Sequence, residues 1–165
     1  MSYQEKRTIT SIFTGILVLT AYLLYAFNPE RLNRIVSGDL KAWAVTMLVF
    51  IGIGIAAAII IQIVFHILLS ISIAIKAKIK DQECDDKEIE KSINSEMIED
   101  ERDKMIELKS NRIGFFIAGF GFIGALASLA LNCSPVVMLN ILFITFSVGS
   151  ILEGIAQLVY YRKGM

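Results

Sequence analysis

Long blocks of apolar residues alternate with polar connections along this chain. Four of these blocks are predicted to form helices, at about 8–27, 42–75, 113–131 and 136–161. The hydrocarbon core of a bilayer is about 30 Å thick, and a helix needs roughly 20 residues to cross it. The pattern therefore predicts an all-α integral membrane four-helix bundle that occupies the single domain 1–165.

The connections between these blocks carry residues that end and begin helices. Pro29 ends the first block, because proline disfavours helical backbone in the residue before it. Asp39 follows a Ser-Gly turn and is predicted to cap the second helix. A tight hairpin is predicted before the fourth helix, with Ser134 as the cap and Pro135 at the first helical position.

The second apolar block, 42–75, is longer than a membrane requires. At 1.5 Å per residue it would extend about 50 Å, so the helix must tilt, bend or project from the membrane. If the helix bends, Gly52 and Gly54 are the expected place. A charged connection, 76–112, follows, and from Ser95 it has a helical period that continues into the third span. We therefore expect helices 2 and 3 to extend into the cytoplasm.

Lysine and arginine are concentrated on one side of the predicted membrane. Two precede the first span, nine lie in the connection 76–112 and two follow the last span, thirteen of the 16 in the chain. The positive-inside rule places this side in the cytoplasm, so we expect a multi-pass cell-membrane protein with cytoplasmic N- and C-termini. The connection also holds twelve acidic residues, and the net charge is zero, so no basic surface for nucleic acid is predicted.

The third span carries small residues at alternating spacings of four and three. They form a helix-packing stripe of Gly114, Ala118, Gly121, Ala125 and Ser128. Small side chains allow a neighbouring membrane helix to approach closely. We expect the stripe to pack within the chain, and a homodimer interface is the alternative.

Polar residues also gather on one face of the second and fourth spans. Glu153 is the only acidic residue in a predicted span, and His66 is the only histidine in the chain. Ionisable residues in a span face a partner or a water-filled cavity, and these two are predicted to lie at similar depth. We therefore predict an intramembrane polar site of Gln62, His66, Glu153 and Gln157, with a contact between His66 and Glu153. A structural clasp and a proton-coupled site are the two interpretations.

The predicted cytoplasmic helix has an acidic face made of Glu96, Asp100, Asp103 and Glu107. Like charges at this spacing repel one another, which favours a divalent cation or a basic partner there. A solvated face without a ligand is the alternative. Lys109 and Arg112 follow at the membrane boundary, where the phosphates of anionic lipid headgroups are available.

Residues that would indicate an enzyme are scarce. No set of Cys, His and carboxylate residues has zinc spacing, and nucleotide-binding loops and a His-Glu-x-x-His motif are absent. We predict no catalytic residues, no metal and no cofactor. The leading prediction is a non-enzymatic interaction or regulatory component that contacts a cytoplasmic protein partner through 76–112. The alternative is a small dimeric transporter or ion-binding protein that uses His66 and Glu153.

Residues 100–113, Asp-Glu-Arg-Asp-Lys-Met-Ile-Glu-Leu-Lys-Ser-Asn-Arg-Ile, lead directly into the third span. This segment resembles an element before the third helix in a family of small prokaryotic four-span membrane proteins, a domain of unknown function. Members of that family are often encoded near small helix-turn-helix transcription regulators. The resemblance implies a bacterial or archaeal inner membrane and a regulatory or stress-linked role. It implies no chemistry, because the family has no established activity.

Overall fold

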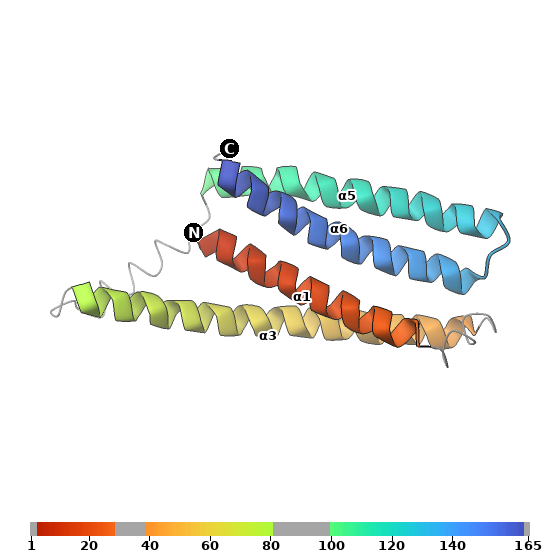
Figure 1. Ribbon diagram of the computed structural model, residues 1–165, viewed down its shortest axis with the longest axis horizontal. Helices are drawn as coiled ribbons and strands as arrows, with labels where there is room; N and C mark the ends of the chain where they lie inside the picture. Colours follow the sequence, from red (N-terminus) through yellow and green to blue (C-terminus); the bar gives the residue numbers. More distant parts are fainter. Residues whose placement is uncertain (1–2, 29–38, 81–99, 164–165) are drawn as a thin grey trace.

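The computed structural model describes residues 3–28, 39–80 and 100–163, which form four helices and short turns (Figure 1). The helices are α1 (Tyr3–Ala26), α3 (Leu40–Lys80), α5 (Glu101–Ala130) and α6 (Pro135–Lys163). Each of the four is long and apolar enough to cross a membrane. The predicted all-α fold with four candidate membrane spans is confirmed.

The four helices lie beside one another in the order α5, α6, α1, α3 (Figure 1). α5 and α6 form a closely packed antiparallel hairpin, α1 packs against α6, and α3 packs against α1 and touches α6. α5 and α3 are the two outer helices of this row. The C-terminal end of α3 extends past the end of the molecule where both chain termini lie. The helices α1, α3 and α6 therefore contact one another, and α5 packs mainly on α6.

The helix boundaries follow the predicted capping residues. The Asp39 carboxylate accepts a hydrogen bond from the Ala42 amide at 3.2 Å, and the Ser134 hydroxyl accepts one from Val136 at 3.3 Å. α3 is helical without interruption through Gly52 and Gly54, the place named for a bend. One prediction is wrong. A helix continuous from Ser95 is excluded, because Asp100 has an extended backbone and caps α5; residues 95–99 themselves lie outside the described part of the chain.

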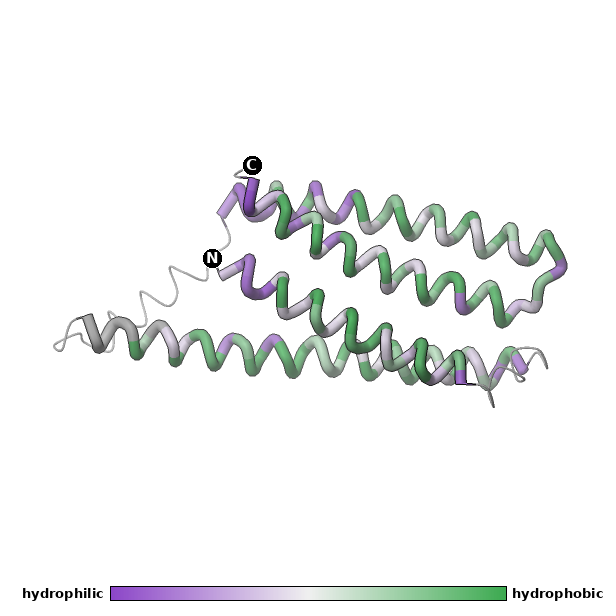
Figure 2. Tube along the Cα trace, viewed as in Figure 1, coloured by the Kyte–Doolittle hydropathy of each residue, from purple (hydrophilic) through white to green (hydrophobic). Residues whose placement is uncertain are grey.

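Large apolar side chains cover the outside of the helices, while several polar side chains are inside. Figure 2 shows hydrophobic residues along most of each helix and hydrophilic ones gathered towards the termini. Leu24 and Phe115 are 74% and 73% exposed. In the described part of the chain, the buried polar residues are Gln4, Thr8, Thr14, Ser110, Ser128 and Asn140. Lipid tolerates an apolar exterior that water would not, and helices in lipid associate through small residues and polar contacts. The chain is an integral membrane protein.

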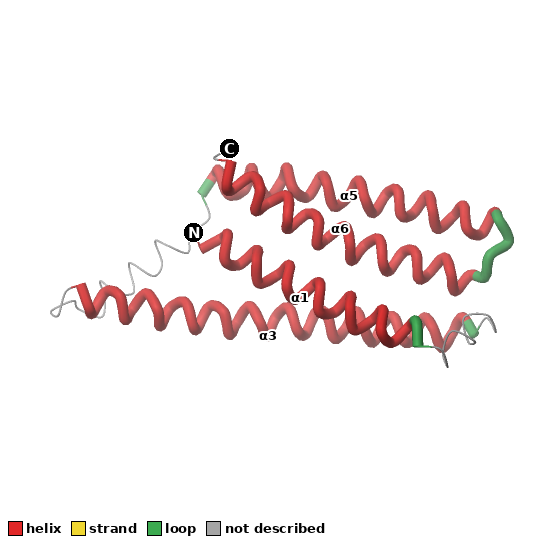
Figure 3. Tube along the Cα trace, in the orientation of Figure 1, coloured by secondary structure: helices red, strands yellow, loops and turns green. Residues whose placement is uncertain are grey.

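The helices also satisfy their polar groups internally, as a hydrocarbon environment requires. Continuous helix pairs the backbone groups along each span (Figure 3). Thr14, Thr20 and Ser147 donate hydrogen bonds to the carbonyl four residues earlier, at 2.9, 2.7 and 2.8 Å. Within the described residues, no buried side-chain nitrogen or oxygen lacks a hydrogen-bond partner.

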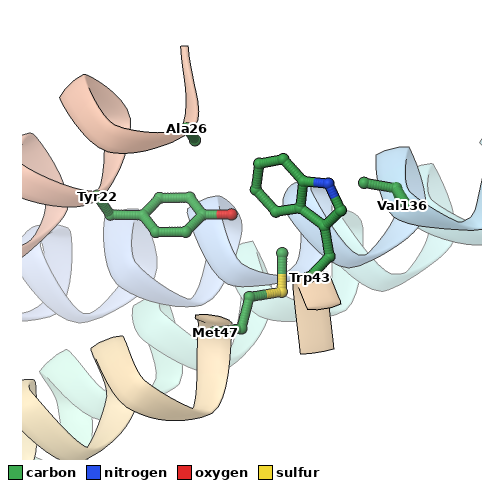
Figure 4. Close-up of a cluster of buried hydrophobic side chains, with 5 residues drawn as sticks. All are labelled: Tyr22, Ala26, Trp43, Met47 and Val136. Atoms are coloured by element: carbon green, nitrogen blue, oxygen red, sulfur yellow. The ribbon is translucent and has the colours of Figure 1, made fainter. Parts of the chain in front are cut away.

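A buried cluster joins α1, α3 and α6 at the end opposite the chain termini (Figure 4). Its members are Tyr22, Ala26, Trp43, Met47 and Val136. The Tyr22 hydroxyl donates a 2.7 Å hydrogen bond to the side-chain oxygen of Asn140. Asn140 in turn donates to the carbonyl of Val136 at 2.8 Å. This apolar cluster with its internal polar pair holds the helices together at one end, and the polar residues described below occupy the other.

Candidate functional site

Polar side chains from all four helices converge on one cavity of about 220 Å³ towards the end of the molecule that holds both termini. The polar residues that line this polar cavity are Gln4, Arg7, Thr8 and Ser11 of α1, Gln62 of α3, Glu107 of α5, and Ser150, Glu153 and Gln157 of α6. The volume has room for several water molecules, each of which takes about 30 Å³ in the liquid. Two carboxylates, one guanidinium and three amides therefore face a shared space.

A hydrogen-bonded group of α1 residues forms one wall of the polar cavity. The Thr8 hydroxyl lies 2.9 Å from the Gln4 carbonyl and 3.1 Å from the side-chain oxygen of Gln157. Its single proton is shared between these two acceptors. Gln4 and Thr8 are both buried. The contact with Gln157 fixes α1 to α6 beside the cavity, so this wall does not depend on a ligand for its position.

The carboxylate of Glu153 occupies space that a glycine on α5 leaves open. A Cβ atom at Gly114 would lie 2.6 Å from Oε2 of Glu153 and 3.4 Å from its Cβ, so a side chain there would displace the carboxylate of Glu153. A Cβ atom on Gly149 would lie 3.1 Å from the carbonyl oxygen of Gly114. Glycines at both positions therefore let α5 and α6 approach closely enough for Glu153 to sit between α5 and the cavity.

The small-residue stripe of α5 packs against α6 inside the same chain. Four of its members, Gly114, Gly121, Ala125 and Ser128, are buried, and Ala118 is half-buried. At Gly121 a Cβ atom would overlap the side chain of Thr145 on α6. Because the stripe is already covered, it is not available as the seam of a homodimer.

His66 belongs to a different contact from the one that we predicted. The hydroxyl of Tyr3 lies 2.6 Å from its Nε2 and 2.9 Å from its Nδ1, and the two rings are 5.3 Å apart. His66 does not line the polar cavity, whereas Gln62, Glu153 and Gln157 do. The structure thus brings together three of the four predicted polar-site residues, and Tyr3 takes the place of Glu153 as the partner of His66.

The predicted acidic face of 96–107 is divided between two roles. Asp100 and Asp103 form a capping box: the Asp100 carboxylate accepts from the Asp103 amide at 2.7 Å, and Asp103 accepts from the Asp100 amide at 3.3 Å. Glu107 lines the polar cavity. Glu96 lies outside the described residues. Lys109 and Arg112 are exposed on α5, and their predicted contact with lipid headgroups stays a prediction.

The capping box gives a testable expectation for the start of α5. Replacing Asp100 by alanine should destabilise the first turn by about 1 kcal/mol, because the amide of Asp103 loses its acceptor. Hydrogen–deuterium exchange of the protein in micelles should then be about fivefold faster for the first-turn amides. Lys104→Ala is the matched control, since Lys104 is exposed and supplies no side chain to the cap. Equal exchange in the two variants would contradict the capping role.

The contribution of α1 is what the sequence analysis missed. Gln4, Thr8 and Ser11 are spaced by four and three residues, so they share one helix face, with Arg7 beside it. The predicted first span began at Thr8, and of the residues before it only Lys6 and Arg7 entered the prediction, as basic residues. The same spacing rule that found the stripe on α5 would have found this face.

Within the described residues, no group of three or more His, Cys, Asp or Glu side chains is placed to hold a metal ion.

No protein-family model matches the chain, and no curated protein or solved structure matches it. The resemblance of residues 100–113 to a prokaryotic family therefore stays a prediction. What the findings support is a chain of four long apolar helices, all of them candidate membrane spans.

Proposed function

We propose that this protein is a non-enzymatic, multi-pass membrane protein that binds a charged polar ligand in the polar cavity. The observation that carries the proposal is the convergence of Arg7, Glu107 and Glu153 on one cavity lined by all four helices. Ionisable side chains within a membrane domain are costly, and they characteristically face a partner or a water-filled pathway. Three glutamine amides add donors and acceptors that suit a ligand with more than one polar group.

The charge distribution supports a cytoplasmic position for this end of the molecule. Thirteen of the 16 lysine and arginine residues lie in the three sequence segments that lead into or out of this end, which are the N-terminal segment, the connection 76–112 and the C-terminal segment. The N- and C-termini and the charged ends of α3 and α5 then lie in or project into the cytoplasm. The polar cavity opens near the inner face of the membrane, where it is within reach of solutes and of lipid headgroups.

Thiol labelling tests whether the cavity is wet and charged. In a background with Cys84→Ser and Cys133→Ser, Gln62→Cys should react with a cationic methanethiosulfonate at least about tenfold faster than Ile63→Cys. Ile63 is the next residue on α3, at the same depth, and faces outward with 53% of its surface exposed. The thiolate is the form of cysteine that reacts, and it forms more readily beside water than in lipid hydrocarbon. A wet cavity therefore makes Gln62→Cys the faster of the two.

A second comparison tests the charge of the cavity. Gln62→Cys should react faster with the cationic reagent than with an anionic one of similar size, because two carboxylates face one arginine. Adding Glu153→Gln should reduce that preference. Equally slow labelling of Gln62→Cys and Ile63→Cys would show a dry cavity and contradict the proposed function.

A second candidate function is docking of a cytoplasmic protein partner on α5. Met105 and Leu108 are 55% and 66% exposed in the charged first half of this helix. They form an apolar surface beside the membrane that a protein partner could contact. Cross-linking from Leu108→Cys in cells, compared with the same variant carrying Met105→Glu, tests this function. Cross-linked products that do not change with Met105→Glu would argue against it. A homodimer, if it forms, uses a surface other than the buried stripe of α5.

A further inference from the structure

A second cavity lies along the same helices as the polar cavity. It has a volume of about 790 Å³ and is lined by α1, α3 and α6, mostly with apolar residues such as Val18, Ile55, Leu142 and Phe146. We call it the apolar cavity. Its size lies within the range of ligand-binding cavities, about 300–1,000 Å³. It extends from the middle of the spans, at Ala58 and Ser150, towards the buried cluster that contains Met47. Lipid hydrocarbon is the surrounding medium over most of this length.

The two cavities adjoin. Ser150 lines both of them. On α1 the polar cavity extends to Ser11 and Ile12, and the apolar cavity begins at Thr14, less than one turn further on. On α3 the apolar lining ends at Ala58, one turn before Gln62. One end of the combined space is polar and charged, and the rest is apolar. This lining matches a ligand with a charged head and a hydrocarbon chain.

The charges at the polar end select among such ligands. Arg7 offers a guanidinium, which has five N–H donors and pairs well with a phosphate even when one donor is used by a protein neighbour. Glu107 and Glu153 accept hydrogen bonds from an ammonium group, as do the side-chain oxygens of the glutamines. An anionic headgroup alone leaves the two carboxylates without a cation, and a quaternary ammonium has no N–H to donate to them.

We propose that the combined cavity binds a phospholipid whose headgroup carries a phosphate and a primary ammonium, as in phosphatidylethanolamine. The phosphate pairs with Arg7, the ammonium with Glu107 and Glu153, and one acyl chain enters the apolar cavity. This proposal deepens the proposed function and rests on it, since it names the ligand of the same polar cavity. A small soluble zwitterion would occupy only the polar cavity. The apolar cavity would then hold water, which finds few hydrogen-bond partners there.

Native mass spectrometry of the purified protein tests the proposal. The probe is an equimolar mixture of phosphatidylethanolamine, phosphatidylcholine and phosphatidylglycerol with identical acyl chains, added to the protein in mild detergent. We expect phosphatidylethanolamine to be retained several-fold more than the other two. Arg7→Gln should reduce its retention, whereas Glu107→Gln combined with Glu153→Gln should shift the preference to phosphatidylglycerol.

A matched pair on α3 tests the acyl-chain part separately. Ala58 lines the apolar cavity, so Ala58→Phe should narrow it and lower retention of all three lipids. Ala56 is exposed and does not line the cavity, so Ala56→Phe should leave retention unchanged. Because this pair leaves the charged residues in place, it remains informative if Arg7→Gln does not fold.

Equal retention of the three lipids, a preference of the unsubstituted protein for phosphatidylglycerol, or no effect of Ala58→Phe would each overturn the lipid proposal. Those outcomes are distinguishable from failure of the proposed function. If Gln62→Cys reacts rapidly while no lipid is preferred, the polar cavity binds a different ligand. If Gln62→Cys is unreactive, both proposals fail together.

Discussion

Replacement of Gly121 by leucine is expected to force α5 and α6 apart and to destabilise the protein by at least about 2 kcal/mol. A Cβ atom at this position would already overlap the Thr145 side chain, so a larger side chain has no place in the interface. The contact lies in the most extensive helix–helix interface of the molecule. Unfolding in mixed micelles by increasing SDS, followed by the fluorescence of Trp43, the single tryptophan, measures the change.

Gly119→Leu is the control for this substitution. Gly119 is on the same helix, and a Cβ atom there would meet no atom within 4 Å. The change should therefore leave stability within about 0.5 kcal/mol, or increase it slightly, because leucine favours helix more than glycine does. If the two leucine variants unfold alike, the steric explanation for the small-residue stripe is wrong.

Removal of the Tyr22 side chain should destabilise the protein by a similar amount. Tyr22 lies at the end of the molecule opposite the chain termini. Tyr22 is fully buried, with ring centroids 4.1 Å from Phe143 and 5.3 Å from Phe50. Tyr22→Ala leaves a cavity between α1, α3 and α6 and is expected to cost about 3 kcal/mol. The same SDS titration measures it.

Tyr22→Phe separates the packing of the ring from the hydrogen bond to Asn140. Polar contacts between membrane helices contribute about 0.6 kcal/mol on average and at most about 1.7 kcal/mol. We therefore expect the phenylalanine variant to lose about 1 kcal/mol, and a double-mutant cycle with Asn140→Ala to show coupling of that order. A phenylalanine variant as unstable as the alanine variant would show that the hydrogen bond, not the ring, holds this cluster.

The two ends of the molecule have different physical organisation, and this bears on the proposals. At the Tyr22 end, aromatic rings fill the space between helices and leave one satisfied polar pair. At the other end, side chains that can carry charge surround a cavity instead of filling it. Stability substitutions at the first end should therefore leave thiol labelling of Gln62→Cys unchanged in the folded fraction, which separates loss of fold from loss of the site.

Several features of this protein could be predicted from the sequence because they depend on neighbours along the chain. The apolar length of each block indicates a span, since the bilayer thickness fixes the number of residues. The caps at Asp39 and Ser134 act over three residues or fewer. The stripe that begins at Gly114 is a property of one helix, and a 3.6-residue period is enough to reveal its shared face.

Other features depended on how the helices lie relative to one another. Residue counts predicted a similar depth for His66 and Glu153, but they could not give the neighbours of either side chain. The packing of the helices decided that His66 meets Tyr3 and that Glu153 faces Gly114. It also placed Glu107, which remains exposed, at the edge of the polar cavity.

The sequence by itself thus determined that this chain crosses the membrane as four helices and which faces of those helices are small or polar. Only the tertiary structure decided which polar faces meet, that α1 supplies Arg7 to the same cavity as Glu153, and that an apolar cavity adjoins it at Ser150. The physical reason is that hydrophobicity fixes the position of a helix along the membrane normal. Helix order and rotation are set by close packing and a few hydrogen bonds between residues distant in the chain.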